Sequence, residues 1–182
     1  MKQNIRNSIL SVLLSLALSP FLARADADAD LKTEAEMAFQ RFQDEDSSLT
    51  NLLAGSAGYV VFPTVGKGGL IFGGGHGNGI VYEQGEASGK ATLTEINIGT
   101  QVGGEAFSEV IFFKTSDALR HFKEGHFEGS ATLNAMVGAE GAALNAKYRE
   151  GVVIFTLPKR GLMVEASVGG QKFSFKPLRA SP

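Results

Sequence analysis

Runs of β-branched and aromatic residues follow one another through most of this sequence, with turn-forming residues rather than helical segments between most of them. The runs are Tyr59–Phe62, Leu70–Phe72, Ile80–Tyr82, Thr92–Ile98, Ala106–Phe113, Ala142–Tyr148, Val152–Leu157, Leu162–Val168 and Gln171–Phe175. Short turns can join antiparallel strands, whereas parallel strands need long crossover connections. The sequence therefore predicts an α+β, mostly β fold, with a strongly curved antiparallel sheet that closes into a barrel or sandwich.

Glycine is abundant, with 23 residues, and most of it falls inside or between the predicted strands. We expect Gly73–Gly79 to form a tight bend, Pro158–Gly161 a turn, and Gly169-Gly170 a two-residue hairpin loop, because these residue types favour turns. A phosphate-binding loop is disfavoured, since the first of these stretches leads into a strand and not into a helix. The glycines therefore indicate bends and bulges in a curved sheet.

Helical periodicity is confined to short segments. Leu31–Phe42 places apolar side chains at three- and four-residue steps, which predicts an N-terminal amphipathic helix. A second helix is predicted at Ser48–Ala54, with Ser47 as its cap. A short internal helix is expected to begin with Ser116 as its cap and to end at Gly125.

The N-terminal helix has two interpretations. In the first, Phe39 and Phe42 insert into a membrane surface; in the second, they pack on the sheet. Helices that lie on membranes tend to be basic, but this one carries Glu34, Glu36 and Asp44. Anionic headgroups would repel such a face, so the sequence favours packing on the sheet.

The first residues have the three parts of a secretory signal peptide. Lys2 and Arg6 precede the apolar run Ile9–Leu22, and Ala23-Arg24-Ala25 supplies the small residues of a cleavage site. The apolar run is too short to span a bilayer comfortably. We therefore predict a signal peptide at residues 1–25 and an exported, periplasmic protein that is soluble or peripherally associated with the membrane.

Charge and composition exclude several classes of function. Removal of residues 1–25 would leave 14 Lys and Arg against 19 Asp and Glu, a balance that disfavours nucleic-acid binding. The absence of cysteine excludes disulfides, thiolate metal sites and a cysteine nucleophile. His121 and His126 are five residues apart, which does not suit a helical metal pair. We interpret Glu105 and Glu109 as surface carboxylates, and we predict no enzymatic activity, cofactor or metal.

Three ordered blocks of the sequence resemble the SYLF domain family. The first runs from Ala57 to Gly69 and on to Val81, the second is Ile98–Phe113, and the third is Gly151–Gly170. Together they cover most of the chain that follows the predicted signal peptide. The resemblance divides that chain into an N-terminal helical segment at residues 26–56 and a SYLF-like β-rich domain at residues 57–178.

The resemblance implies lipid binding without catalysis. The family is known for binding membrane lipids, which are phosphoinositides in eukaryotic members, and for actin-associated roles in yeast relatives. Lys67 matches the lysine of the first block, and Lys159 and Arg160 fall in the predicted turn of the third. These three cations are the candidate contacts to a phospholipid headgroup, although ordinary solvated turn residues would look the same. An envelope structural or adaptor protein that binds another protein is the alternative, and an unrecognised hydrolase is a third.

Overall fold

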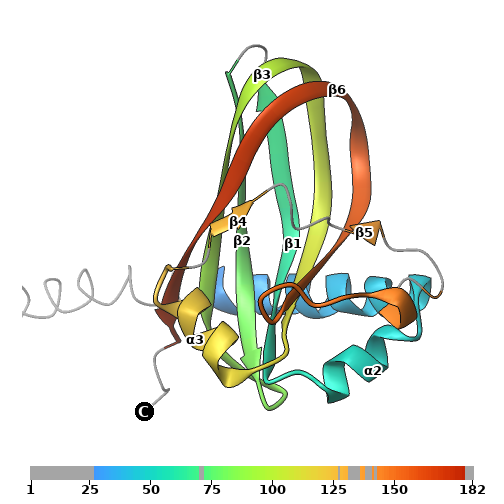
Figure 1. The fold of residues 1–182 in the computed structure, drawn as a ribbon, viewed down its shortest axis with the longest axis vertical. Helices are drawn as coiled ribbons and strands as arrows, with labels where there is room; N and C mark the ends of the chain where they lie inside the picture. The colour runs from blue at the N-terminus through green and yellow to red at the C-terminus, as the bar shows by residue number, and fades with distance from the viewer. Residues whose placement is uncertain are drawn as a thin grey trace, which may run out of the picture.

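The computed structural model describes residues 27–69, 72–126, 128–130, 136–137, 141 and 143–178 (Figure 1). The predicted signal peptide, residues 1–25, lies outside the described residues. From residue 27 the chain forms an N-terminal helix (residues 27–45), then a second helix, and then a sheet that contains most of the remaining chain.

One six-stranded sheet organises the molecule, and four of its strands are long. These are β1 (Gly58–Gly69), β2 (Phe72–Glu83), β3 (Glu86–Phe113) and β6 (Val152–Pro177). Two short strands, β4 (Glu128–Ser130) and β5 (Met136–Val137), pair with β6. The pairings are antiparallel except that of β5 with β6, so the predicted antiparallel, mostly β architecture is confirmed.

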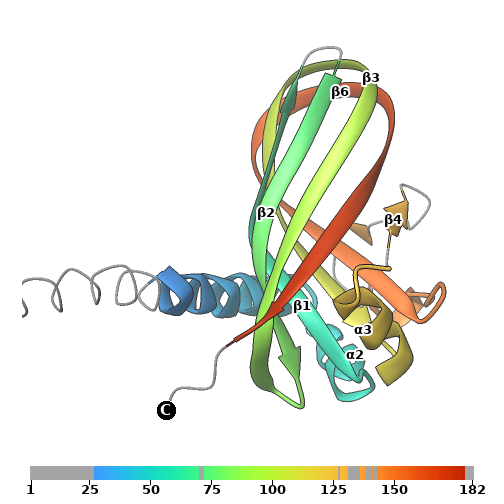
Figure 2. The same ribbon diagram turned by 90° about the vertical axis from the view of Figure 1, so that its left-hand side faces the viewer.

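The sheet is curved because β3 and β6 each continue through a bend at its upper end (Figures 1 and 2). The first half of β3 pairs with β2 and its second half with β1, while β6 follows β3 along nearly its whole length. Each side of the folded sheet therefore ends in one half of β6. No pairing between those two halves occurs among the described residues. The expectation of a closed barrel is wrong, since β4 and β5 pair with the outer edge of β6 instead.

Several predicted turns are parts of continuous strands. Gly73–Gly79 lies within β2 and is paired on both sides, with β1 and with β3. Pro158–Gly161 and Gly169-Gly170 lie within β6, which passes through both without a hairpin. Glycine favours turns locally, but here each stretch has backbone partners on neighbouring strands, and those hydrogen bonds hold it extended.

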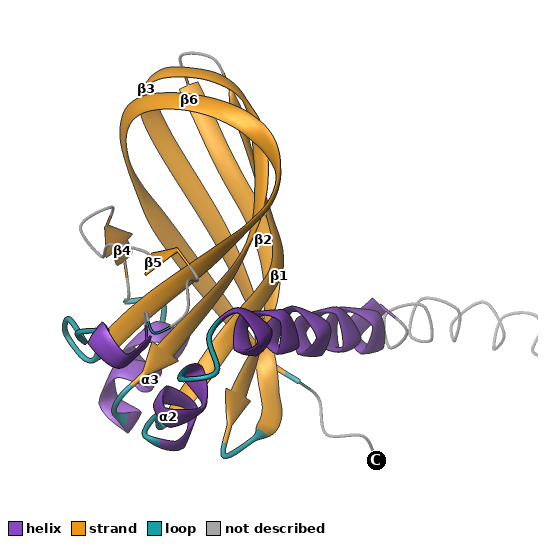
Figure 3. Ribbon diagram, turned by 90° about the vertical axis from the view of Figure 1, so that its right-hand side faces the viewer, coloured by secondary structure: helices purple, strands orange, loops and turns teal. Residues whose placement is uncertain are grey.

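The two faces of the sheet carry separate apolar cores. The outer face packs against the N-terminal helix, whose Phe42 is fully buried and whose Phe39 stacks on Tyr59 with ring centroids 5.0 Å apart. This observation confirms that the helix packs on the sheet; Figures 2 and 3 show it crossing the lower part of that face. On the inner face, enclosed by the bend, Phe173 packs against both Phe62 of β1 and Phe122 of the internal helix.

The helices differ from prediction at their ends. α2 (Leu49–Ala54) takes Ser48, and not Ser47, as its N-cap, and the carboxylate of Asp46 accepts hydrogen bonds from the backbone N–H and the hydroxyl of Ser48.

The predicted strand Ala142–Tyr148 is wrong, because the described residues there form a short 3₁₀ helix, Ala143–Asn145, followed by irregular chain. Asp46 fixes that segment as well, since its second oxygen accepts from the Ala143 backbone N–H at 2.8 Å.

The internal helix, α3 (Ser116–Lys123), and its N-cap both lie one residue earlier in the chain than predicted. Thr115, and not Ser116, has extended backbone geometry and accepts a side-chain hydrogen bond from the N–H of Ala118. Gly125, with φ +75°, ends the helix as expected. The Thr115→Ala variant should lose about 1 kcal/mol of unfolding free energy, the typical value of a cap.

The matched control for this prediction is Ser116→Ala, since Ser116 was the cap expected from the sequence. Urea unfolding followed by circular dichroism measures both variants. A larger loss in the Ser116 variant than in the Thr115 variant would contradict the observed cap.

Candidate functional site

A layer of polar side chains lies on the inner face of the sheet, next to the apolar core. Lys67 of β1 and Glu95 of β3 form an ion pair with 2.7 Å between Nζ and Oε1, and their side chains are only 12% and 10% exposed. In register, Lys67 lies opposite Gly75 of β2, and Gly75 lies opposite Glu95. The ion pair therefore spans the middle strand.

Gly75 provides the space for this ion pair. A Cβ atom at position 75 would lie 3.2 Å from Cβ and 3.3 Å from Oε2 of Glu95. The same strand brings Gly77 and Gly79 to the inner face, where side chains of β1 lie over them. The alternating glycines of β2 thus let larger groups from β1 and β3 meet above the middle strand.

Glu109 is the most buried carboxylate of the layer. It is 1% exposed, so its interpretation as a surface carboxylate is wrong. Oε2 accepts a hydrogen bond from the Gln171 side-chain amide at 3.1 Å, while Oε1 is buried without a hydrogen-bond partner among the described residues. Burial raises the pKa of Glu109 to about 7, with the hydrogen bond from Gln171 and the charge of Lys67 lowering it and the charge of Glu95 raising it.

The bond between Glu109 and Gln171 crosses the interior of the folded sheet. Glu109 pairs in register with Thr156, in the first half of β6, whereas Gln171 lies in the second half and pairs with Glu95. The two residues are therefore not neighbours along the ladder. Their side chains meet because the bend brings opposite ends of the sheet face to face.

Lys159 lies on the other face of the sheet. Phe107 pairs with Pro158 and Ala106 with Arg160, so Lys159 is the extra residue of a β-bulge. Its Nζ donates to Oγ1 of exposed Thr64 at 2.8 Å. Thr64 and Val65 alternate along β1, and Val65 belongs to the inner core, which places Thr64 and Lys159 outside.

The three predicted cations therefore do not converge on one point. Lys67 is in the inner ion pair and Lys159 is at the outer bulge, while the backbone of Arg160 follows in β6 and its side chain lies outside the described residues. Sequence reasoning missed Glu95 and Gln171 and misplaced Glu109. The sequence signal that could have revealed the layer is the two-residue spacing of Gly75, Gly77 and Gly79. This spacing indicates one face of a strand, and not a turn.

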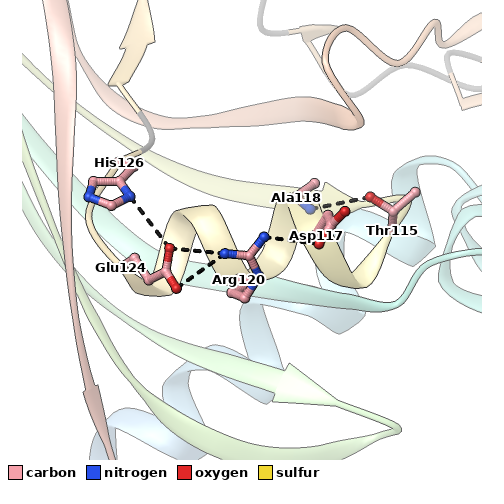
Figure 4. A network of polar contacts seen from close by, with 6 residues as sticks. All are labelled: Thr115, Asp117, Ala118, Arg120, Glu124 and His126. Atoms are coloured by element: carbon pink, nitrogen blue, oxygen red, sulfur yellow. Dashed lines mark hydrogen bonds and ion pairs between the residues drawn. The ribbon is translucent and has the colours of Figure 1, made fainter.

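A groove of about 700 Å³ lies beside α3, at the lower end of the sheet. Leu119 and Phe175 contribute apolar surface, and Lys123 reaches over the Phe175 ring while its Nζ lies 2.7 Å from Glu83. Figure 4 shows that Arg120 lies between Asp117 and Glu124 on the same helix. The charged groups lining the groove are thus already neutralised by neighbours.

The described residues define no metal centre. Their His, Asp and Glu side chains form no cluster of three or more that could hold a metal ion. In the same part of the chain, none of the helices has the length and apolar character needed to cross a bilayer.

The fold is a β-rich domain in which one bent sheet carries an apolar core on each face and a polar layer on the inner face. Residues 94–177, from within β3 to the end of β6, match the Ysc84 family, described as "Las17-binding protein actin regulator". The match covers less than half of the chain, and it confirms that the chain resembles the Ysc84, or SYLF, domain family, as the sequence blocks indicated. The family consists of non-catalytic binding domains and is generally associated with lipid binding.

A bacterial relative extends the similarity beyond the matched domain. The chain is 27% identical over 163 residues to "Beta cell expansion factor A" of Aeromonas veronii. The alignment covers 88% of this chain and 61% of the relative. The chain thus spans less than two thirds of the relative's length.

Proposed function

We propose that this chain is a non-catalytic lipid-binding protein of the bacterial cell envelope, exported by a signal peptide that ends at Ala25. The family match over residues 94–177 carries the proposal, because it covers most of β3 and all of β6, the two longest strands of the sheet. The mature protein would then consist of a helical segment, residues 26–56, and the β-rich domain, residues 57–178. Phospholipid at a membrane surface would be its ligand.

The outer bulge supports headgroup contact by Lys159 and Arg160. An ammonium group beside the hydroxyl of Thr64 offers a phosphate both a charge and a hydrogen-bond donor. β-bulges redirect side chains out of the regular alternation of a strand. Lys159 occupies such a position next to exposed polar surface, where a headgroup has access.

Lys67 would contact a headgroup in a different way, because its ammonium group already forms an ion pair with the carboxylate of Glu95. A phosphate oxygen has the same charge sign as the Glu95 carboxylate and could replace it in the ion pair. Contact between Lys67 and a headgroup would therefore require an exchange of partners inside the bent sheet.

Co-sedimentation with vesicles of phosphatidylethanolamine and phosphatidylglycerol tests the proposal. The chain from Asp26 onward should bind, and Lys159→Glu/Arg160→Glu should weaken binding by about tenfold or more, since charge-assisted contacts contribute about 1.5–3 kcal/mol each. Arg41→Glu/Lys147→Glu is the matched control, because it makes the same charge change at exposed positions elsewhere.

Two results would count against the proposal. No sedimentation of the unaltered protein with either lipid would remove lipid binding itself. Equal binding by the bulge variant and the control would remove Lys159 and Arg160 from the site while leaving lipid binding in place.

A second candidate function is binding to another envelope protein, as a structural or adaptor component. The description of the family names a protein partner, Las17, for its members, which favours this alternative. Crosslinking of the mature chain in a periplasmic extract should then give one reproducible protein adduct. Recovery of the uncrosslinked chain alone would eliminate this candidate.

A further inference from the structure

The inner polar layer holds a buried carboxyl group that the proposed lipid contacts do not use. Glu109 lies in the second half of β3, and its one hydrogen-bond partner in the described part of the chain is Gln171 in the second half of β6. That bond joins two parts of the sheet that are not paired with each other. The remaining oxygen, Oε1, is buried, and no described residue forms a hydrogen bond with it.

An ionised carboxylate is poorly accommodated in this position. A carboxylate that is removed from water needs hydrogen bonds to both oxygens, and a neutral carboxyl group needs fewer. Among the described residues, the charges of Lys67 from β1 and of Glu95 from the first half of β3 act on Glu109. Glu105 shares its strand and face but is not one of the groups that shift its pKa. Because Lys67 is already in contact with Glu95 at 2.7 Å, its charge is shared between two carboxylates.

We propose that Glu109 is a proton-controlled latch of the bent sheet: its neutral form fits the buried layer between β3 and the second half of β6, and its ionised form favours separation of the two, because the charge needs water. The Gln171 amide stabilises the ionised form, but one hydrogen bond does not replace the water that burial removes. Ionisation gives the proton to solvent, and the carboxylate becomes hydrated when the second half of β6 moves away. The latch controls the opening of the sheet and does not depend on whether the protein binds lipid.

The direction of the pH dependence follows from linkage. The burial that raises the pKa of Glu109 from its ordinary value of 4.5 to about 7 is absent when the latch is open. Below pH 4.5 the group is neutral in both forms, and opening is least favourable. Between pH 4.5 and 7 only the open form loses its proton, so opening becomes easier as pH rises. Above pH 7 both forms are ionised and the dependence levels off.

Hydrogen exchange measured by mass spectrometry tests the latch on the intact chain. With exchange rates corrected for their intrinsic pH dependence, protection in residues 168–177 should fall about tenfold from pH 6 to pH 8. Peptides from α3 should show a smaller change, because opening is local. The Glu109→Gln variant has the same shape and stays neutral, so its protection should not change with pH.

Glu105→Gln is the matched control, since it removes a carboxylate from the same face of the same strand. It should keep the tenfold pH dependence. An equal pH dependence in wild type and Glu109→Gln would overturn the latch, as would wild-type protection that is constant between pH 6 and pH 8. The Gln171→Leu variant gives a second test: loss of the amide donor should lower protection in residues 168–177 already at pH 6, and unchanged protection there would also overturn it.

Discussion

The Gly79→Ala variant is expected to lose about 3 kcal/mol of unfolding free energy, the upper part of the range for overpacking a well-filled core. A Cβ atom at this position would lie 2.6 Å from the carbonyl oxygen of Val61 and 2.7 Å from Cδ1 of Phe62. Both atoms belong to β1, and the Val61 oxygen is part of the backbone, so β1 and β2 must separate to admit even a methyl group. Urea unfolding followed by circular dichroism measures the loss.

Gly66→Ala is the matched control for that variant. Gly66 also lies in the paired region of β1, but a Cβ atom there would meet no atom within 4 Å. Its stability should stay within about 0.5 kcal/mol of wild type, as for other exposed substitutions. Equal losses in the two variants would mean that glycine flexibility, rather than the close approach of β1 to β2, determines the effect at position 79.

The Lys67→Met variant should be destabilised by about 3–5 kcal/mol, because it removes one partner of a nearly buried ion pair. Denaturant unfolding measures the loss, and a variant as stable as wild type would contradict the prediction.

The double variant Lys67→Met/Glu95→Gln separates the ion pair from the packing of the lysine chain. It should recover most of the stability, since neither position of the former ion pair then carries a charge. If the single variant is as stable as wild type, the ion pair does not stabilise the fold. Vesicle binding by the folded double variant then reports on Lys67 as a headgroup contact without the confounding effect of misfolding.

Much of the architecture follows from local patterns in the sequence. The mostly β composition, the amphipathic N-terminal helix and α3 were predictable because their apolar spacing coincides with the faces that become buried. The turns expected at Gly73–Gly79 and Gly169-Gly170 were wrong for a non-local reason. Whether a glycine-rich stretch bends or extends depends on strands paired beside it, and those partners lie far away in the chain.

The inner polar layer could not be predicted from local sequence patterns, for a similar reason. Lys67 was identified through the family resemblance, but its partner Glu95 was not. The two side chains meet because Gly75 of β2 pairs with Lys67 on one side and with Glu95 on the other. A shift of one residue in either register would put the side chains on opposite faces. Glu109 resembled any strand carboxylate in the sequence, and only the bend of β3 and β6 encloses it.

The position of β6 in the chain has a consequence for the order in which the domain is assembled. β6 follows every other described strand, yet it is the neighbour of β3 along nearly the full length of both. During synthesis, β3 would have one edge without a partner until β6 emerges, and closing such distant contacts is slow. A chain that cannot complete its sheet early stays unfolded for longer, which would suit the export proposed above.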